Sequence, residues 1–201
     1  MSTRGFFGNR NKKPARPIPP GQYIENGFPV LSAGPTPNIE RTTWEFTVEK
    51  AGDVLKRWSW DEILRLPATE MNVDIHCVTK WSKLDTYWKG VSIDTLLENA
   101  DLKLPPGEFV VAFCEGGYTT NVPAADLVDG KAILAYEYDG QPLSPEHGGP
   151  ARLFIPHLYF WKSAKWIIGM RFMDKDSPGF WESYGYHMYG DPWSEQRYSD
   201  D

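Results

Sequence analysis

Apolar and polar residues alternate along several short stretches of the chain, and this period of two predicts β-strands. Every second residue is apolar in "TTWEFTVEK", residues 42–50. In "MNVDIHC", residues 71–77, the apolar residues share one face, so Cys77 lies at the carboxyl end of a predicted strand. Further strands are predicted at residues 109–114, at 132–143 with a turn at Asp139-Gly140, at 151–156 and at 165–173.

Two short helices are predicted between these strands. Ser59 is followed three residues later by Glu62, a capping-box pattern that begins a helix ending at Pro67. Ser92 caps a second helix over residues 92–100. Several strands with few, short helices and no internal repeat predict an α+β (mixed α/β) fold with mixed β-sheets.

The two ends of the chain lack this periodicity. Residues 1–22 are rich in Gly, Pro and basic residues, and a Pro-rich segment follows them. We therefore expect a flexible, basic and Pro-rich N-terminal arm over residues 1–40 and one folded domain over residues 41–201. The last segment, from Phe180 onwards, is aromatic without clear periodicity, and we expect it to wrap the surface of the domain.

The composition agrees with one globular domain of 201 residues, 41% hydrophobic and 14% aromatic. The formal net charge is −6, and the first twenty residues hold five basic residues and no acid, so the body is more acidic still. An acidic body argues against nucleic acid as a partner. No apolar run is long enough to span a membrane, and no apolar signal segment follows the basic N-terminus. We expect a cytoplasmic monomer without a membrane anchor.

The chain has two cysteines, Cys77 and Cys114, so a disulfide framework is excluded and at most one bridge remains open. No spacing typical of a structural zinc site occurs. Cys77 is a small buried apolar residue on one reading. On another, Lys80 and Lys83 favour its thiolate, which would serve as a nucleophile or as a ligand for a soft metal. A Cys–His hydrolase using His147, His157 or His187 stays an alternative.

A second cluster of polar residues lies in "HGGPAR", residues 147–152, and "KSAK", residues 162–165. His147 offers a ring donor, the two glycines allow close backbone approach, and Arg152 offers a fork of donors. Lys162, Ser163 and Lys165 add further donors. The cluster suits an anion such as a phosphate group. On the alternative reading, Arg152 and Lys165 are solvated charges at a strand edge.

These motifs resemble those of a known family. "DGQPL", "HGGPAR", "IP" and "KSAKW", in order between Leu134 and Trp166, resemble the molybdopterin-binding domain of the sulfite oxidase family, and "DIHC" falls where that family carries its metal-ligating cysteine. "FPVLSAGPTP", "GGYTTNVP" and "HLYFWKSAKW" are similar to a bacterial subgroup of small, stand-alone members. The likeness covers about residues 40–175. It implies a sulfite-oxidase-type fold of mixed β-sheets and short helices, and molybdenum with molybdopterin as cofactors.

The resemblance also implies roles for individual residues. Cys77 is expected to ligate molybdenum beside the two dithiolene sulfurs of the pterin. An aromatic side chain close to the metal would come from Tyr184 or Tyr186. The residues expected to hold the pterin and its phosphate are His147, Arg152, Ser163, Ala164, Lys165 and either Thr119 or Thr120.

Three positions depart from the pattern of sulfite oxidases proper. Leu31 or a near neighbour stands where those enzymes carry an arginine, and Lys80 and Trp81 replace asparagine and arginine after the cysteine. A site for the sulfite dianion needs several cations, so these departures leave the substrate open between sulfite-like anions and S- or N-oxides. The residues expected to line the substrate pocket are His76, Lys80, Trp81 and Tyr186.

The function expected from the resemblance is transfer of an oxygen atom to or from a small-molecule substrate. Because the sequence shows no second redox centre, the electrons are expected to pass to or from a separate carrier. A module that stores molybdopterin without turnover and a Cys77-dependent hydrolase remain alternatives from other classes.

Overall fold

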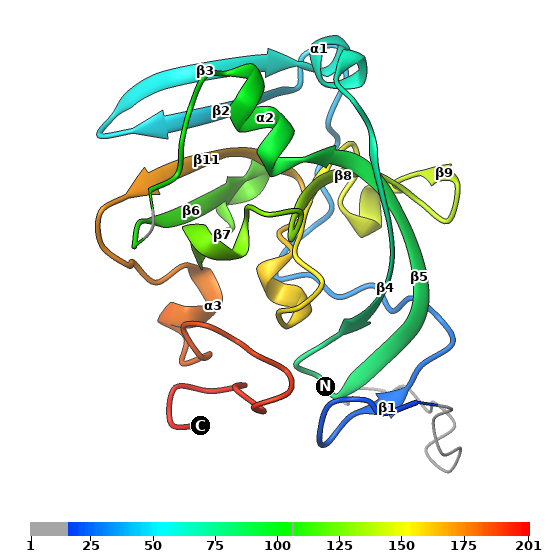
Figure 1. The fold of residues 1–201 in the computed structure, drawn as a ribbon. Coiled ribbons are helices and arrows are strands. Elements are labelled where there is room, and N and C mark those ends of the chain that lie inside the picture. Colours follow the sequence, from blue (N-terminus) through cyan, green and yellow to red (C-terminus); the bar gives the residue numbers. More distant parts are fainter. Residues whose placement is uncertain (1–15, 106) are drawn as a thin grey trace.

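The computed structural model describes residues 16–105 and 107–201, so the first fifteen residues of the expected arm lie outside the described residues. Two mixed β-sheets and a few short helices form the fold, and this confirms the α+β class with mixed sheets (Figure 1). The helices are α1 (Trp60–Arg65), α2 (Ile93–Asn99) and α3 (Phe180–Ser183), with single 3₁₀ turns η1 (Glu115–Gly117), η2 (Ala124–Asp126), η3 (Pro145–His147) and η4 (Phe160–Lys162).

The six-stranded sheet has the order β1-β5-β8-β10, with β4 paired to β5 and β9 to β8. β4 and β5 run along one side of the molecule, as Figure 1 shows. The loop between them carries Cys77. The strands of this sheet are β1 (Tyr23–Ile24), β4 (Thr69–His76), β5 (Trp81–Ser92), β8 (Ile133–Tyr138), β9 (Gln141–Pro142) and β10 (Arg152–Phe154).

The five-stranded sheet has the order β3-β2-β11-β6-β7, in which β2 and β11 are parallel and the other neighbours antiparallel. It packs on the larger of two hydrophobic clusters, while the smaller cluster lies against the other sheet and includes Cys77, Trp81 and Trp161. The strands are β2 (Glu45–Lys50), β3 (Asp53–Ser59), β6 (Phe109–Cys114), β7 (Thr119–Pro123) and β11 (Ile167–Met173).

Most local predictions are confirmed. Ser59 and Glu62 form both bonds of a capping box at α1, and Ser92 caps α2 by accepting from the backbone N–H of Thr95. The predicted strands correspond to β2, β4, β6, β8, β10 and β11. The strands β3, β5 and β7 were not predicted, because their residues do not alternate cleanly and only their neighbours make them strands.

The described part of the N-terminal arm, residues 16–40, contacts the body at β1 and at Arg16. β1 pairs in parallel with the start of β5 at Trp81 and Ser82. Arg16 donates to the carboxylates of Asp74 and Asp85, so this basic residue is tied to the fold. Sequence reasoning missed these contacts because two-residue strands and single ion pairs leave no periodic pattern. The domain boundary at residue 40 stays a prediction.

The C-terminal segment lies across the end of the molecule that carries the Cys77 loop. After α3, an isolated bridge joins Tyr186 to Tyr198, and the backbone N–H of Tyr159 donates to Gly190 O at 2.8 Å. Within the described residues, no helix is long and apolar enough to cross a membrane.

Gly90 tests the packing of β5 on β8. A Cβ atom at residue 90 would lie 2.2 Å from Leu134 O and 2.7 Å from Ala135 Cα, and backbone cannot move aside as a flexible side chain can. We expect Gly90→Ala to lower the free energy of unfolding by about 2 kcal/mol or more, measured by urea denaturation. Gly34→Ala is the control, because a Cβ atom there meets nothing within 4 Å. Equal stability of the two variants would contradict this account.

Candidate functional site

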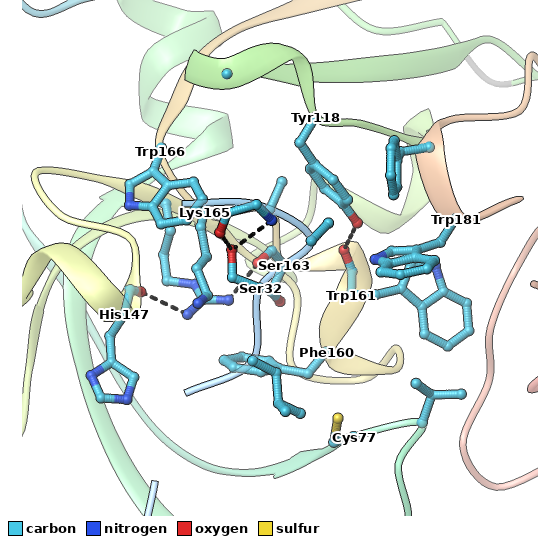
Figure 2. A pocket seen from close by; sticks show the side chains of 18 of the residues that line it. Ser32, Cys77, Tyr118, His147, Phe160, Trp161, Ser163, Lys165, Trp166 and Trp181 are labelled. Atoms are coloured by element: carbon cyan, nitrogen blue, oxygen red, sulfur yellow. Dashed lines mark hydrogen bonds between the residues drawn. The ribbon is translucent and has the colours of Figure 1, made fainter. Parts of the chain in front are cut away.

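A pocket of about 570 Å³ lies between the two sheets, the N-terminal segment and α3. Cys77 lies at one end of it, and His147, Lys165 and Trp166 lie at the other (Figure 2). Residues from "FPVLSAGPTP" form part of the wall. Of the predicted site residues, those that line this pocket are Cys77, Trp81, His147, Arg152, Ser163, Ala164, Lys165 and Tyr186.

Cys77 begins the tight loop between β4 and β5. Its backbone N–H donates to Trp81 O at 2.8 Å, and its carbonyl accepts from the N–H of Lys80 at 3.0 Å. Lys80 takes a left-handed φ of 74° to close the turn. The Sγ atom accepts a hydrogen bond from Thr79 Oγ1 at 3.1 Å, and the side chain is buried. The loop geometry thus directs one thiol into the pocket.

The expectation that Lys80 and Lys83 stabilise a thiolate is wrong for the protein without a ligand. Lys80 is exposed and does not line the pocket, and Lys83 Nζ donates to Asn26 O. Burial raises the pKa of Cys77, and the hydrogen bonds from Thr79 oppose this only in part. A cationic group or a metal ion is needed before the thiolate becomes the stable form.

Aromatic rings form the wall beside Cys77. Trp181 stacks on Tyr186 with centroids 5.0 Å apart, and Trp161 meets Tyr186 edge-on at 5.1 Å. Trp81 is 2% exposed, and its buried Nε1 has no hydrogen-bond partner among the described residues. A ligand in this part of the pocket meets apolar faces and one unpaired N–H donor.

Two predicted residues lie away from this wall. Tyr184 is 73% exposed and does not line the pocket, so of the two tyrosines it is Tyr186 that lies near Cys77. His76 is buried outside the pocket, with Nδ1 2.8 Å from Ser82 Oγ. The alternation of faces itself holds, since Ile75 and Cys77 belong to one hydrophobic cluster and His76 does not. His76 instead lies edge-on to Trp193 of the C-terminal segment, with ring centroids 6.3 Å apart.

Arg152 dominates the opposite end of the pocket. Its side chain is buried, Nη1 donates to His147 O at 2.8 Å, and Nη2 donates to Ser163 O. The guanidinium lies over the ring of Phe160, 4.2 Å from its centroid. Burial lowers the pKa of Arg152 to about 9. The reading of Arg152 as a solvated strand-edge charge is therefore wrong.

The Nε atom of Arg152 is buried and has no hydrogen-bond partner among the described residues. A buried donor on a charged group is costly to leave unpaired, and it points to a ligand that accepts from it.

Lys165 and His147 complete this end. Lys165 Nζ donates to Glu146 O at 2.6 Å, and burial together with the charge of Arg152 lowers the pKa of Lys165 to about 8. His147 stacks on Phe28 at 4.0 Å, and its Nε2 lies 3.1 Å from Phe28 O. Burial also lowers the pKa of His147, which favours the neutral ring. Lys165 and Arg152 are thus the two cationic residues at this end of the pocket.

Gly148 is required by this arrangement. It has a φ of 107°, and a Cβ atom there would lie 3.0 Å from Lys165 Cβ and 3.2 Å from Arg152 Cβ. The glycine thus lets the backbone pass close to both cationic residues. The close approach predicted from "HGGPAR" is made to these side chains.

The threonines predicted as cofactor contacts do not line the pocket. Thr120 is fully buried and donates to Glu182 Oε1 at 2.9 Å, while Thr119 lies in β7. Tyr118, one residue earlier, does line it, and its hydroxyl donates to Trp161 O at 2.7 Å. The motif "GGYTTNVP" correctly indicated a segment that lines the pocket, but the strand register decides which of its residues faces the pocket.

The residues present fit a ligand with an anionic group at one end and a soft metal at the other. Two unpaired buried donors, two cations with lowered pKa values and one thiol meet in a single pocket. No three of the described His, Cys, Asp and Glu side chains gather so as to hold a metal ion. A metal at Cys77 would therefore take its other ligands from the bound group.

The comparisons with known proteins agree with this geometry. The family model described as oxidoreductase molybdopterin-binding domain matches residues 33–181. The uncharacterized oxidoreductase YuiH of Bacillus subtilis strain 168 is 43% identical over 96% of this chain and 98% of its own length. The chain therefore belongs to the oxidoreductase molybdopterin-binding domain family. More particularly, it is an oxidoreductase of the sulfite oxidase family.

Two more distant proteins place the fold. Mouse mitochondrial sulfite oxidase is 25% identical over 88% of this chain, which spans 39% of that enzyme's length. The sulfane dehydrogenase SoxCD of Paracoccus pantotrophus superposes with a TM-score of 0.60 at 20% identity, over 70% of this chain and 40% of that one. The second likeness supports the fold alone.

The lowered pKa of Lys165 predicts a pH dependence of stability. Between pH 8 and 10.5 the folded protein has released this proton while the unfolded chain, with its ordinary pKa of 10.5, still holds it, so stability rises with pH. Relative to Lys165→Met, wild type should gain about 1–2 kcal/mol between pH 7 and 10, a value reduced for the partly exposed side chain. Urea denaturation of both ligand-free proteins at each pH measures it. A difference that does not change with pH would contradict the assignment.

Proposed function

We propose that this protein is a molybdenum- and molybdopterin-dependent oxidoreductase that transfers an oxygen atom to or from a small substrate. The observation that supports this most directly is the placement of Cys77 and of the buried, partly unpaired Arg152 in one pocket. When bound, the metal supplies the two-electron oxygen-atom chemistry, and the protein holds and orients the cofactor.

In this proposal Cys77 Sγ is the protein's ligand to molybdenum, since a thiolate suits a sulfur-rich site. Arg152 Nε and Lys165 Nζ bind the phosphate of the pterin, and His147 orients it from the side. The buried cations favour a dianionic group, because their own burial without an anion is costly. Tyr118 and the "KSAK" loop close the pocket around the pterin.

The substrate side of the pocket supports a neutral S- or N-oxide over sulfite. The rings of Trp161, Trp181 and Tyr186 lie beside Cys77, whereas Arg152 and Lys165 belong to the other end. A dianion would enter this aromatic region without a cation to pair with. We propose that Trp81 contributes its unpaired Nε1–H to the oxygen of the substrate.

Electrons are exchanged with a separate carrier in this proposal. Tyr186 lies at the pocket, and its contact with the half-exposed Tyr198, at 5.7 Å, joins the pocket wall to the surface. A carrier docking on this side would come close to the cofactor.

The hydrolase alternative is less well supported. The hydrogen bond to Cys77 Sγ comes from Thr79, and the histidines considered have other partners. His157 contacts Asp126, and the ring of His187 accepts from the backbone N–H groups of Tyr189 and Gly190.

Replacing the thiol tests the ligand assignment. We expect Cys77→Ser to lower turnover with an artificial electron carrier at least 100-fold, while much of the pterin is retained because the phosphate contacts lie at the other end. Cys114→Ala is the matched control, since Cys114 is a second buried, free thiol outside the pocket lining. Full activity of Cys77→Ser would contradict the assignment. Molybdenum and pterin in wild type without turnover on sulfite, S-oxides or N-oxides would favour storage.

A second substitution tests the phosphate end. Lys165→Met should hold about tenfold less pterin at limiting cofactor, because it removes one charge-assisted hydrogen bond, with pterin measured by the fluorescence of its oxidised form. Lys131→Met is the control, because Lys131 Nζ also donates to a backbone carbonyl, Ala125 O, at 2.6 Å but does not line the pocket. Equal pterin content in both variants would place the phosphate elsewhere.

A further inference from the structure

The loop that carries Cys77 is held from outside by two side chains. Gln22 Nε2 donates to Cys77 O at 3.1 Å and to Trp81 O at 3.3 Å. Arg197 Nη1 donates to Val78 O at 2.8 Å. Three carbonyls of the loop over residues 77–81 thus accept hydrogen bonds from two side chains, and neither side chain belongs to β4 or β5.

Gln22 and Arg197 also contact each other. Arg197 Nη2 lies 3.3 Å from Gln22 Oε1 and 3.2 Å from Pro20 O, so it donates to both. Arg197 is 6% exposed, and its guanidinium lies 4.9 Å from the ring centroid of Tyr159. The carboxylate oxygen of the half-exposed Glu195 is 3.7 Å away. A buried guanidinium with several hydrogen-bond partners is held in one orientation, and it holds in turn the loop whose carbonyl accepts from it.

Both residues lie outside the part of the chain that matches the family model, residues 33–181. Gln22 comes from the segment before it and Arg197 from the segment after it. The two segments meet over the loop of Cys77, although 175 positions separate the two residues along the chain. The segments therefore add contacts to the thiol loop that the matched domain alone does not provide.

Arg197 also brings a cationic group to this loop through its hydrogen bond to Val78 O. Lys80 and Lys83, which the sequence suggested for this place, lie elsewhere, since Lys80 is exposed and Lys83 Nζ donates to Asn26 O.

We infer that Gln22 and Arg197 are positioning residues that set the orientation of the Cys77 Sγ atom toward the metal. The inference rests on the proposed function, in which Cys77 is the molybdenum ligand. Groups that hold a metal ligand from behind tune its geometry, and their loss typically costs about 10–100-fold in metal affinity or activity.

The competing explanation is that the pair only fastens the two ends of the chain together. Gln22→Glu separates the two roles, because the carboxylate keeps an oxygen for Arg197 but cannot donate to Cys77 O or Trp81 O. Arg197→Met removes both the guanidinium hydrogen bonds and the positive charge, whereas Arg197→Lys keeps the charge but loses the guanidinium group. Arg171→Met is the control, since Arg171 is an exposed arginine paired with Glu49 outside the pocket lining.

The experiment loads each variant with molybdopterin and molybdenum and measures metal content, pterin content, turnover and the paramagnetic resonance signal of partly reduced molybdenum. At wild-type cofactor content, we expect Gln22→Glu and Arg197→Met to change this signal and to lower turnover about tenfold or more. The turnover and the signal of Arg197→Lys should lie between those of Arg197→Met and of wild type. Arg171→Met should match wild type in both measurements.

An unchanged signal and turnover in Gln22→Glu would overturn the inference, as would losses in Arg197→Met that only follow lost cofactor. If Arg197→Met does not fold, Gln22→Glu still decides, because it preserves the contact between the two ends. A wild-type protein that binds no molybdopterin would overturn the proposed function and this inference together, and the wild-type cofactor content distinguishes that result from failure of the inference alone.

Discussion

The pocket depends on one buried ion pair. The side chains of Lys162 and Glu182 are both 0% exposed, and Lys162 Nζ lies 2.6 Å from Glu182 Oε1. Taking two charges out of water costs several kcal/mol for each ion, and only good geometry with further hydrogen bonds offsets that cost. Lys162 Nζ meets this condition by donating also to Asn121 O, Asn121 Oδ1 and Met188 O at 2.7–2.8 Å. The pair thus joins η4, β7, α3 and the C-terminal segment at one point.

Both ends of the pocket follow from this junction. Trp161 Nε1 donates to Glu182 Oε1 at 2.8 Å, which fixes the indole that meets Tyr186 beside Cys77. On the other side, Lys162 leads directly into residues 163–165, whose first carbonyl accepts from Arg152. Thr120, predicted to touch the cofactor, instead donates to the same carboxylate oxygen. Its contribution to the site is therefore to satisfy the ion pair that places the aromatic wall and the Arg152 end of the pocket.

Local sequence patterns predicted the strands, helix caps and turns that depend on interactions between residues close together in the chain. The alternation in residues 42–50, the capping box at Ser59 and the turn at Asp139-Gly140 correspond to β2, α1 and the β8–β9 hairpin. The resemblance brought out eight of the residues that the fold gathers in one pocket. The features that sequence patterns did not predict depend on partners far along the chain. β1 is a strand because it pairs with β5, and Thr120 donates to Glu182, 62 positions away. Lys80 failed because a left-handed turn directs it outward.

The electrostatics of the pocket link folding to the bound group. Arg152 and Lys165 lie together at one end of the pocket, and burial lowers both pKa values. The folded protein therefore carries an unfavourable arrangement of charge, which the dianionic phosphate of the proposed cofactor would relieve. A group that binds the folded state alone stabilises it by mass action. At the other end burial raises the pKa of Cys77, which favours the protonated thiol over the thiolate. In the proposed function, each end of the pocket would be completed by the opposite charge of a single ligand, with the anion at Arg152 and the metal at Cys77.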